Sequence, residues 1–295
     1  MFEKVNPCHP DKVADRIAGA IVDLCYTKCK NPKVACEVLI GHGECTLQIE
    51  TSERLAAEEL EAIVHRIAGE DIVVRALIVP QDVHLADNQK GGVKCGDNGI
   101  FKGCAPTHEQ KLLTAIAASI YDRHPSDGKY IIQGKEWSDT DTEWSATICQ
   151  SHLSNEDAPE LLEHLHNNYG INNVSINPLG EWTGGPNTDS GATNRKLGSD
   201  MGFGVTGGGL HGKDLSKGDV SINIVAFLKA VQSGQAVTAI CSIGDEHVTF
   251  QYASGKTETE TFADVVEMAR LYILTDCNGS FETFSEWGLI RPKDV

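Results

Sequence analysis

The residues best suited to chemistry in this 295-residue chain lie between Gly180 and Asp219. This segment is rich in glycine, lysine, arginine and aspartate. Glycine lets a backbone approach a ligand closely, and lysine and arginine neutralise phosphate oxygens. Carboxylates hold the hard cations that accompany polyphosphates. The chain has 25 Lys+Arg against 42 Asp+Glu, yet four basic residues fall between Arg195 and Lys217, so the segment predicts a polyphosphate site.

The stretch from Gly207 to Lys213 nearly matches the G-x-x-x-x-G-K-[ST] phosphate-binding loop. Asp214 stands where that loop needs a hydroxyl for magnesium, and residues 199–206 before it form a poor strand. A P-loop NTPase is therefore disfavoured, whereas a glycine-rich phosphate cradle of another design fits.

A second candidate is His9-Pro10-Asp11-Lys12, at the start of a predicted helix. Pro10 and Asp11 are typical of a helix start, so capping alone explains them. The functional alternative is that the positive helix N-terminus binds an anion, with Asp11 holding a metal.

Three further features are weaker. Asp127-Gly128-Lys129 and Gly96-Asp97-Asn98-Gly99 are turns by default. Glu37 lies within the apolar strand predicted over 34–40, where we expect it to be buried and to hold a cation or another partner, because an unpaired buried charge is costly.

Composition excludes several classes of protein. The net charge of −17 disfavours nucleic acid and anionic membranes as partners, since both demand positive charge. No apolar run approaches the roughly 20 residues that span a bilayer, and the N-terminus lacks the apolar core of a signal peptide. The 10 cysteines include no C-x-x-C pair, which favours free thiols in a reducing cytoplasm.

Strand pairs interrupted by amphipathic helices recur about three times along the chain. Helical spacing predicts helices over 12–29, from Ser52 to Ile67, and over 109–122, 158–168, 219–232 and 261–272. Strands are expected over 34–40, 46–50, 72–79, 130–133, 145–151, 174–176, 236–243 and 248–252, with a long loop over 81–104. The pattern predicts an α+β, two-layer α/β protein, divided near 105 and 220 into parts 1–105, 106–220 and 221–295.

Taken in order, the motifs resemble the S-adenosylmethionine synthetase (methionine adenosyltransferase) family over nearly the whole chain. The most specific similarity is Gly207-Gly208-Gly209 with Gly212-Lys213-Asp214, Ser216-Lys217 and Asp219, which is similar to the family's GGGAFSGKDPSKVD. The others are HPDK at 9–12, Ala35-Cys36-Glu37, GDNG at 96–99, Asp127-Gly128-Lys129, and the block from Asn177 to Asp200. Departures include Cys8, Glu181, Leu210, a shorter stretch over 81–96 that gates the site in the family, and a shorter C-terminal part.

The resemblance implies a fold of three similar βαβ-type subdomains in a pseudo-threefold arrangement. It implies that the methionine sulfur attacks C5′ of ATP and expels triphosphate, which is then hydrolysed to diphosphate and phosphate. A thioether has no proton to lose, so catalysis must chiefly neutralise the leaving group. Homodimers with active sites between subunits, sometimes paired into tetramers, are also implied. The open alternatives are a tripolyphosphatase or ATPase without methionine coupling, and a non-catalytic ATP-binding partner of an active paralogue.

By resemblance, His9, Lys129, Arg195 and Lys213 are the catalytic candidates. The ATP contacts implied are His9, Lys12, Asp127, Lys129, Trp182, Asp189, Arg195, Lys196 and Lys213, with the Trp182 indole stacking on adenine. The methionine contacts implied are Glu50, Gln81, Asp97, Asp189, Lys217 and Ile243. Asp11 and Asp219 should hold Mg²⁺, two ions per site, and Glu37 should hold K⁺.

Overall fold

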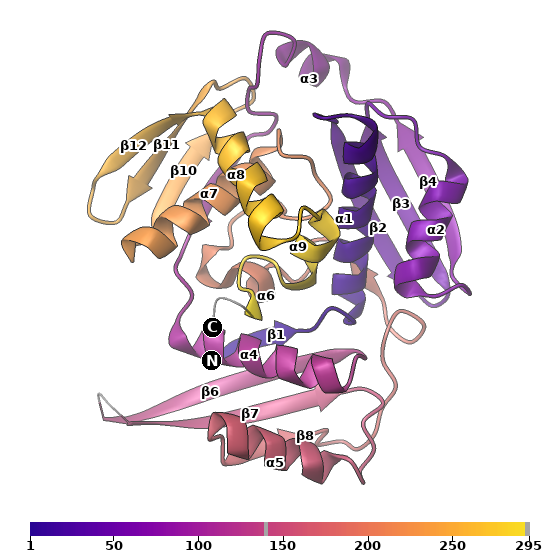
Figure 1. The fold of residues 1–295 in the computed structure, drawn as a ribbon, viewed down its shortest axis with the longest axis vertical. Helices are drawn as coiled ribbons and strands as arrows, with labels where there is room; N and C mark the ends of the chain where they lie inside the picture. Colours follow the sequence, from indigo (N-terminus) through magenta and orange to yellow (C-terminus); the bar gives the residue numbers. More distant parts are fainter. Residues whose placement is uncertain (139–140, 293–295) are drawn as a thin grey trace.

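The computed structural model of the chain describes residues 1–138 and 141–292, and these form three four-stranded sheets (Figure 1). The first has the order β1 (Phe2–Val5), β6 (Gly128–Ser138), β7 (Asp141–Gln150), β8 (Asn173–Ile176). The second runs β4 (Val73–Val79), β3 (Glu44–Thr51), β2 (Val34–Gly41), β9 (Gly191–Ala192). The third runs β12 (Thr257–Thr261), β11 (His247–Tyr252), β10 (Val237–Cys241), β5 (Gly99–Gly103). The mixed α/β class predicted from the sequence is confirmed.

Each sheet takes one strand from a distant part of the chain. β1 pairs with β6, β5 pairs with β10, and β9 pairs with β2. The sheets therefore interleave along the sequence, and they do not coincide with the ranges 1–105, 106–220 and 221–295.

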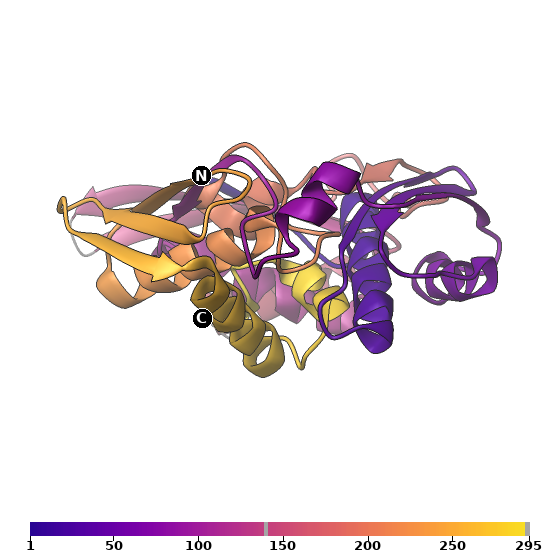
Figure 2. The same cartoon turned by 90° about the horizontal axis from the view of Figure 1, so that it is seen from above.

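The helices lie mainly on one side of these sheets, as Figure 2 shows for α1, α2 and α8. They are α1 (Pro10–Lys28), α2 (Ala57–Ala68), α3 (Val83–Asn88), α4 (His108–Arg123), α5 (Ala158–Tyr169), α6 (Leu197–Met201), α7 (Gly218–Ser233), α8 (Phe262–Asp276) and α9 (Phe281–Trp287). Helices α1 and α7 are the most deeply buried, and the apolar side chains of both belong to one large core. A separate core joins α4 and α5 to the β1–β6–β7–β8 sheet.

Most predicted elements are found within a few residues of their expected ends. Two expectations were wrong. The stretch 81–104 is not a continuous loop, because Asp82 caps the short helix α3 and residues 99–103 pair with β10. Helix α2 begins at Ala57 rather than near Ser52, and Glu59 accepts a hydrogen bond from the Ala56 N–H. The short elements β1, β9, α6 and α9 were not predicted.

Strand β2 alternates between the core and an open face. Cys36, Val38 and Ile40 are buried, whereas Glu37 and Leu39 are exposed on the opposite face. A strand that reads as continuously apolar is therefore covered on one side only. The expectation that Glu37 is a buried charge was wrong.

A buried lysine joins the two ends of the chain. Lys4 Nζ donates to the carbonyl oxygens of Ser199 at 2.8 Å, Trp287 at 3.1 Å and Ile290 at 2.9 Å. Its side chain is fully buried, so these bonds replace the water that the ammonium gave up. Strand β1 is thereby tied to both α6 and the segment that follows α9.

Within the described part of the chain, which includes all ten cysteines, every thiol is free. Six of them are buried. In the same part of the chain, none of the helices combines the length and apolarity needed to cross a membrane.

We predict that Lys4→Met lowers the free energy of unfolding by about 3 kcal/mol, because three buried carbonyl groups lose their donor. Chemical denaturation measures this loss. Lys28→Met is the control, since Lys28 makes only an exposed ion pair with Glu59, and such pairs contribute about 0–1 kcal/mol. Equal effects of the two substitutions would contradict the structural role of Lys4.

Candidate functional site

The first turn of α1 presents a neutral imidazole. His9 caps this helix, and its Nδ1 accepts a hydrogen bond from the Asp11 N–H at 3.2 Å. Burial and the nearby ammonium groups of Lys196 and Lys129 lower the pKa of His9 to about 3. His9 is therefore uncharged near neutral pH, and Nε2 carries the proton and can serve as a donor.

Asp11 lies beside His9 and has one satisfied and one unsatisfied oxygen. Its Oδ1 accepts from the Ala192 N–H at 2.9 Å and lies 3.2 Å from Arg195 Nε. Its Oδ2 is buried without a hydrogen-bond partner among the described residues, and the nearest ammonium there, that of Lys196, is 3.9 Å away. A buried carboxylate oxygen without a donor fits a hard cation such as Mg²⁺.

Glu3 holds the two remaining lysines of this group. Its carboxylate oxygens lie 3.1 Å from Lys129 Nζ and 3.5 Å from Lys196 Nζ. Glu3 pairs with Ile131 across β1 and β6. Lys129 is two residues from Ile131 along β6, so the side chains of Glu3 and Lys129 lie on the same face of the sheet. Glu3 could not be identified as a site residue from the sequence, because a single glutamate in a four-residue edge strand forms no recognisable motif.

Asp127 lies next to this group and is buried. Its Oδ2 accepts from the Gly185 N–H at 2.9 Å, while its Oδ1 is buried and has no hydrogen-bond partner within residues 1–138 and 141–292. Burial raises the pKa of Asp127 to about 6, the Gly185 N–H opposes this, and the charges of Asp189 and Asp11 raise it further. Near neutral pH the carboxyl is therefore mostly ionised, and it can accept hydrogen bonds from a ligand or contact a cation.

A second group lies at the start of α7. Lys213 Nζ donates to Asp219 Oδ2, and Asp219 sits in the first helical turn. Burial lowers the pKa of Lys213, but Asp219 outweighs it, with contributions from Glu37 and Asp97, and the net pKa is raised. Lys213 is therefore a firmly charged ammonium held by a carboxylate. Glu37 itself accepts a hydrogen bond from Thr193 Oγ1.

The four basic residues that predicted a polyphosphate site are not alike in their surroundings. Arg195, Lys196 and Lys213 each have a carboxylate partner, while Lys217 is half-buried at the start of α7. The local positive charge expected from the sequence is thus balanced by acids brought in from β1, α1 and α7. A phosphate ligand has to exchange with those acids.

Lys12 is placed differently from the expectation. Its side chain is fully buried, and its Nζ lies 3.0 Å from Asp15 Oδ2 and 2.7 Å from Asp200 Oδ2. The ammonium offers no free surface to a nucleotide in this arrangement, so we leave Lys12 out of the proposed ATP contacts.

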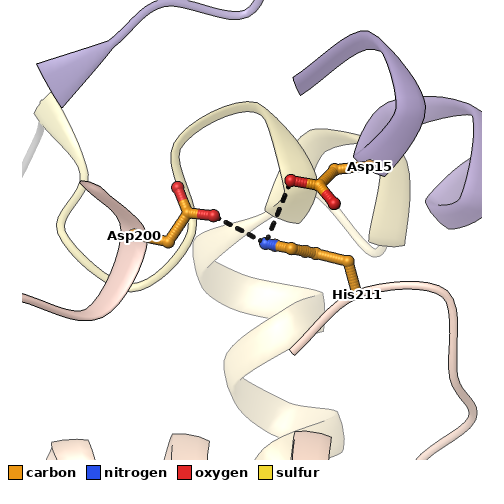
Figure 3. A group of neighbouring side chains, drawn as sticks. All are labelled: Asp15, Asp200 and His211. Atoms are coloured by element: carbon orange, nitrogen blue, oxygen red, sulfur yellow. Dashed lines mark hydrogen bonds and ion pairs between the residues drawn. The ribbon is translucent and has the colours of Figure 1, made fainter. Parts of the chain in front are cut away.

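Three side chains near the Lys12 ammonium lie close enough to one another to ligate a metal: Asp15, Asp200 and His211 (Figure 3). His211 Nε2 is 2.9 Å from Asp200 Oδ2, and His211 Nδ1 is 3.0 Å from Ser285 Oγ. Burial raises the pKa of Asp200, but Lys12 and the His211 hydrogen bond lower it more, to below the usual range. The Lys12 ammonium already supplies the cation here, so the cluster is a buried ion pair.

The remaining candidates lie around these groups. Trp182 is half-buried, donates from Nε1 to Asn177 Oδ1 at 3.1 Å, and lines a cavity of about 260 Å³ with Cys149 and Leu179. Asp189 is exposed and its charge acts on His9.

Of the candidate methionine contacts, Asp97 and Ile243 are brought together through Asn98, which bonds to both. Glu50 pairs with Val79, two residues before Gln81, so those two lie at the same end of β3 and β4.

We predict that Asp127→Asn removes a pH dependence of stability in the protein free of nucleotide and Mg²⁺. The folded carboxyl, with a pKa of about 6, binds its proton more tightly than the unfolded one, so its contribution is complete below about pH 4. That contribution is lost as the pH rises through about 6, which costs the wild type up to about 3 kcal/mol. When unfolding is measured from pH 4 to 8, the free energy of unfolding of Asp127→Asn should therefore rise relative to that of the wild type as the pH increases. Parallel curves would contradict the raised pKa.

Comparison with known proteins gives concordant results. The family described as "S-adenosylmethionine synthetase, N-terminal domain" matches residues 1–73. S-adenosylmethionine synthase of Helicobacter pylori strain J99 is 29% identical over 322 residues, covering 92% of this chain and 80% of that protein. The Helicobacter hepaticus enzyme is 29% identical over 342 residues, covering 99% and 88%. A solved structure titled "Structure of an Unusual S-adenosylmethionine synthetase from Campylobacter jejuni" has a TM-score of 0.68 at 19% identity, covering 96% of this chain and 88% of that one.

The structural match shows the fold, and the sequence matches extend over nearly the whole chain. The chain is therefore similar to S-adenosylmethionine synthetases in fold and over nearly its whole length, and its first 73 residues match the N-terminal domain of that family.

Proposed function

We propose that the protein is a methionine adenosyltransferase that forms S-adenosylmethionine from ATP and L-methionine. One observation carries the proposal. Asp11 and Asp219 are buried carboxylates in the first turns of the two central helices, and each is paired with a cation, Arg195 or Lys213. Helix N-termini favour anions, so carboxylates and cations together suit a metal-bound polyphosphate.

In this reaction a lone pair of the methionine sulfur forms a bond to C5′ of ATP while the C5′–O bond breaks. The electron pair leaves with the triphosphate and the sulfur becomes a sulfonium. Water then cleaves the triphosphate to diphosphate and phosphate. No residue has to remove a proton in the first step, so the protein's task is to hold the negative charge that departs.

We assign Arg195, Lys196, Lys213 and Lys129 to the phosphates. His9, neutral and with a proton on Nε2, can donate a hydrogen bond to the oxygen that leaves C5′. Asp11, with its unsatisfied oxygen, and Asp219 would hold two Mg²⁺ ions, which when bound neutralise phosphate charge. Asp127 would accept from the nucleotide. Potassium at Glu37 rests on the resemblance alone, because that side chain is exposed and bonded to Thr193.

We place adenine against Trp182, whose cavity is lined mainly by apolar atoms and suits a flat ring. For methionine we propose two groups of contacts. They are Glu50 with Gln81 on one side, and Asp97, Asp189, Lys217 and Ile243 on the other.

A homodimer that completes each site across its interface is also proposed. The open faces of the sheets carry apolar side chains that water would otherwise surround. Ile100 and Ile240 face each other across β5 and β10 and are 58% and 72% exposed, and Leu39 and Leu77 are exposed on the β4–β3–β2–β9 sheet. Exposed apolar surface of this kind marks an interaction face. Light scattering measures the assembly, including any tetramer.

Incubation with ATP, methionine, Mg²⁺ and K⁺ tests the activity. S-adenosylmethionine and methionine-dependent phosphate release are expected. Phosphate release without methionine would instead support a tripolyphosphatase or ATPase. Nucleotide binding without any turnover would support a non-catalytic partner of an active paralogue.

We predict that Lys213→Ala lowers kcat by about 100- to 1,000-fold, because loss of one preorganised charge costs about 2.7–4 kcal/mol in comparable sites. Lys229→Ala is the matched control. Lys229 is also paired with carboxylates and is similarly covered, at 13% exposed against 15% for Lys213, but it lies near the opposite end of α7 from Asp219. Steady-state kinetics with near-normal turnover in Lys213→Ala would remove this lysine from the mechanism.

A further inference from the structure

Asn194 lies between the two basic groups of the site. It directly precedes Arg195 and has a left-handed backbone, with φ of 63°. Asparagine tolerates this conformation better than most residues with a side chain. The position therefore allows a polar side chain where the backbone alone would favour glycine.

The backbone of Asn194 is anchored to the buried ion pair below it. Its N–H donates to Asp15 Oδ1 at 2.8 Å, and Asp15 Oδ2 is held by Lys12 at 3.0 Å. The segment that carries Arg195 and Lys196 is thus fixed to helix α1.

The side chain of Asn194 holds the other basic segment. Oδ1 accepts from the N–H groups of Leu210 at 2.8 Å and His211 at 2.9 Å, and Nδ2 lies 3.3 Å from the His211 carbonyl oxygen. These bonds satisfy backbone groups in the loop of residues 208–213, which we call the Lys213 loop. The single residue Asn194 therefore links the segment that carries Arg195 and Lys196 to the Lys213 loop.

The Lys213 loop is held on its far side as well. The Cys36 N–H donates to the Gly212 carbonyl oxygen at 2.7 Å. The loop also packs closely against Asn194, since a Cβ at Gly209 would lie 2.7–2.9 Å from the atoms of the Asn194 amide. The loop has little freedom to shift unless Asn194 changes.

We propose that Asn194 is a positioning residue that sets the separation between Arg195–Lys196 and Lys213, so that both groups can bind one polyphosphate chain. Asn194 need not touch the substrate. It acts through the backbone bonds that place the cations, and a ligand bound at two points is sensitive to small errors in their spacing. This inference rests on the proposed function, because it assumes that the two cation groups share a triphosphate.

The test is the affinity for inorganic tripolyphosphate with Mg²⁺, measured by calorimetry without ATP or methionine. Asn194→Gly keeps the left-handed backbone and deletes only the amide, and we expect about tenfold weaker binding. Asn278→Gly is the matched control, since Asn278 also has a positive φ, of 53°, but is exposed between α8 and α9. It should bind tripolyphosphate as the wild type does.

Gly209→Ala covers the case in which Asn194→Gly fails to fold, and where Asn194→Gly does fold the double variant adds a further test. Gly209→Ala forces a methyl group against the Asn194 amide, so alone it should also weaken tripolyphosphate binding. In the Asn194→Gly background the atoms it would strike are gone, and Gly209→Ala should have no further effect. Such non-additivity is not expected of two unrelated losses of stability.

The outcomes separate the two proposals. Tripolyphosphate binding by the wild type with an unchanged Kd in Asn194→Gly or in Gly209→Ala would overturn the role of Asn194 and leave the proposed function standing. Absence of tripolyphosphate binding by the wild type would overturn the proposed function together with this inference.

Discussion

The buried ammonium of Lys12, held between Asp15 and Asp200, is the interaction on which the candidate site depends. Asp15 anchors the backbone of Asn194, and Asp200 lies on α6 and accepts from His211 of the Lys213 loop. Three segments that are distant in sequence therefore meet at one ammonium shared by two buried carboxylates. Removing the ammonium would leave two buried carboxylates without compensation, which is far more costly than any surface ion pair.

Other cationic side chains of the candidate site are each paired with a carboxylate. Arg195 is held by Asp11, Lys129 and Lys196 by Glu3, and Lys213 by Asp219. This arrangement orders the cations, and a phosphate ligand has to displace the carboxylates to bind them. In the proposed reaction, phosphates that bind Arg195 and Lys213 would leave the carboxylates of Asp11 and Asp219 free to hold Mg²⁺.

The sequence was sufficient for the parts of this arrangement that rest on local pattern. Helical spacing located α1 and α7, and the glycine-rich block pointed to Arg195, Lys196 and Lys213. The sequence was insufficient to predict a residue's role where the residue's partner is distant along the chain. Glu3 and Asn194 carry no local signal, Lys12 looked like a phosphate ligand because its motif adjoins a helix start, and Glu37 looked buried because both faces of its strand are apolar in composition. The pairing of β1, β5 and β9 with distant strands also depends on tertiary contacts that no local window contains.

A crystal structure with Mg²⁺ and a non-hydrolysable ATP analogue tests most directly whether Arg195 and Lys213 bind the triphosphate while Lys12 has a structural role. The account predicts triphosphate oxygens in contact with Arg195 and Lys213, while Lys12 remains between Asp15 and Asp200. A triphosphate bound by Lys12, or bound away from both Arg195 and Lys213, would contradict it.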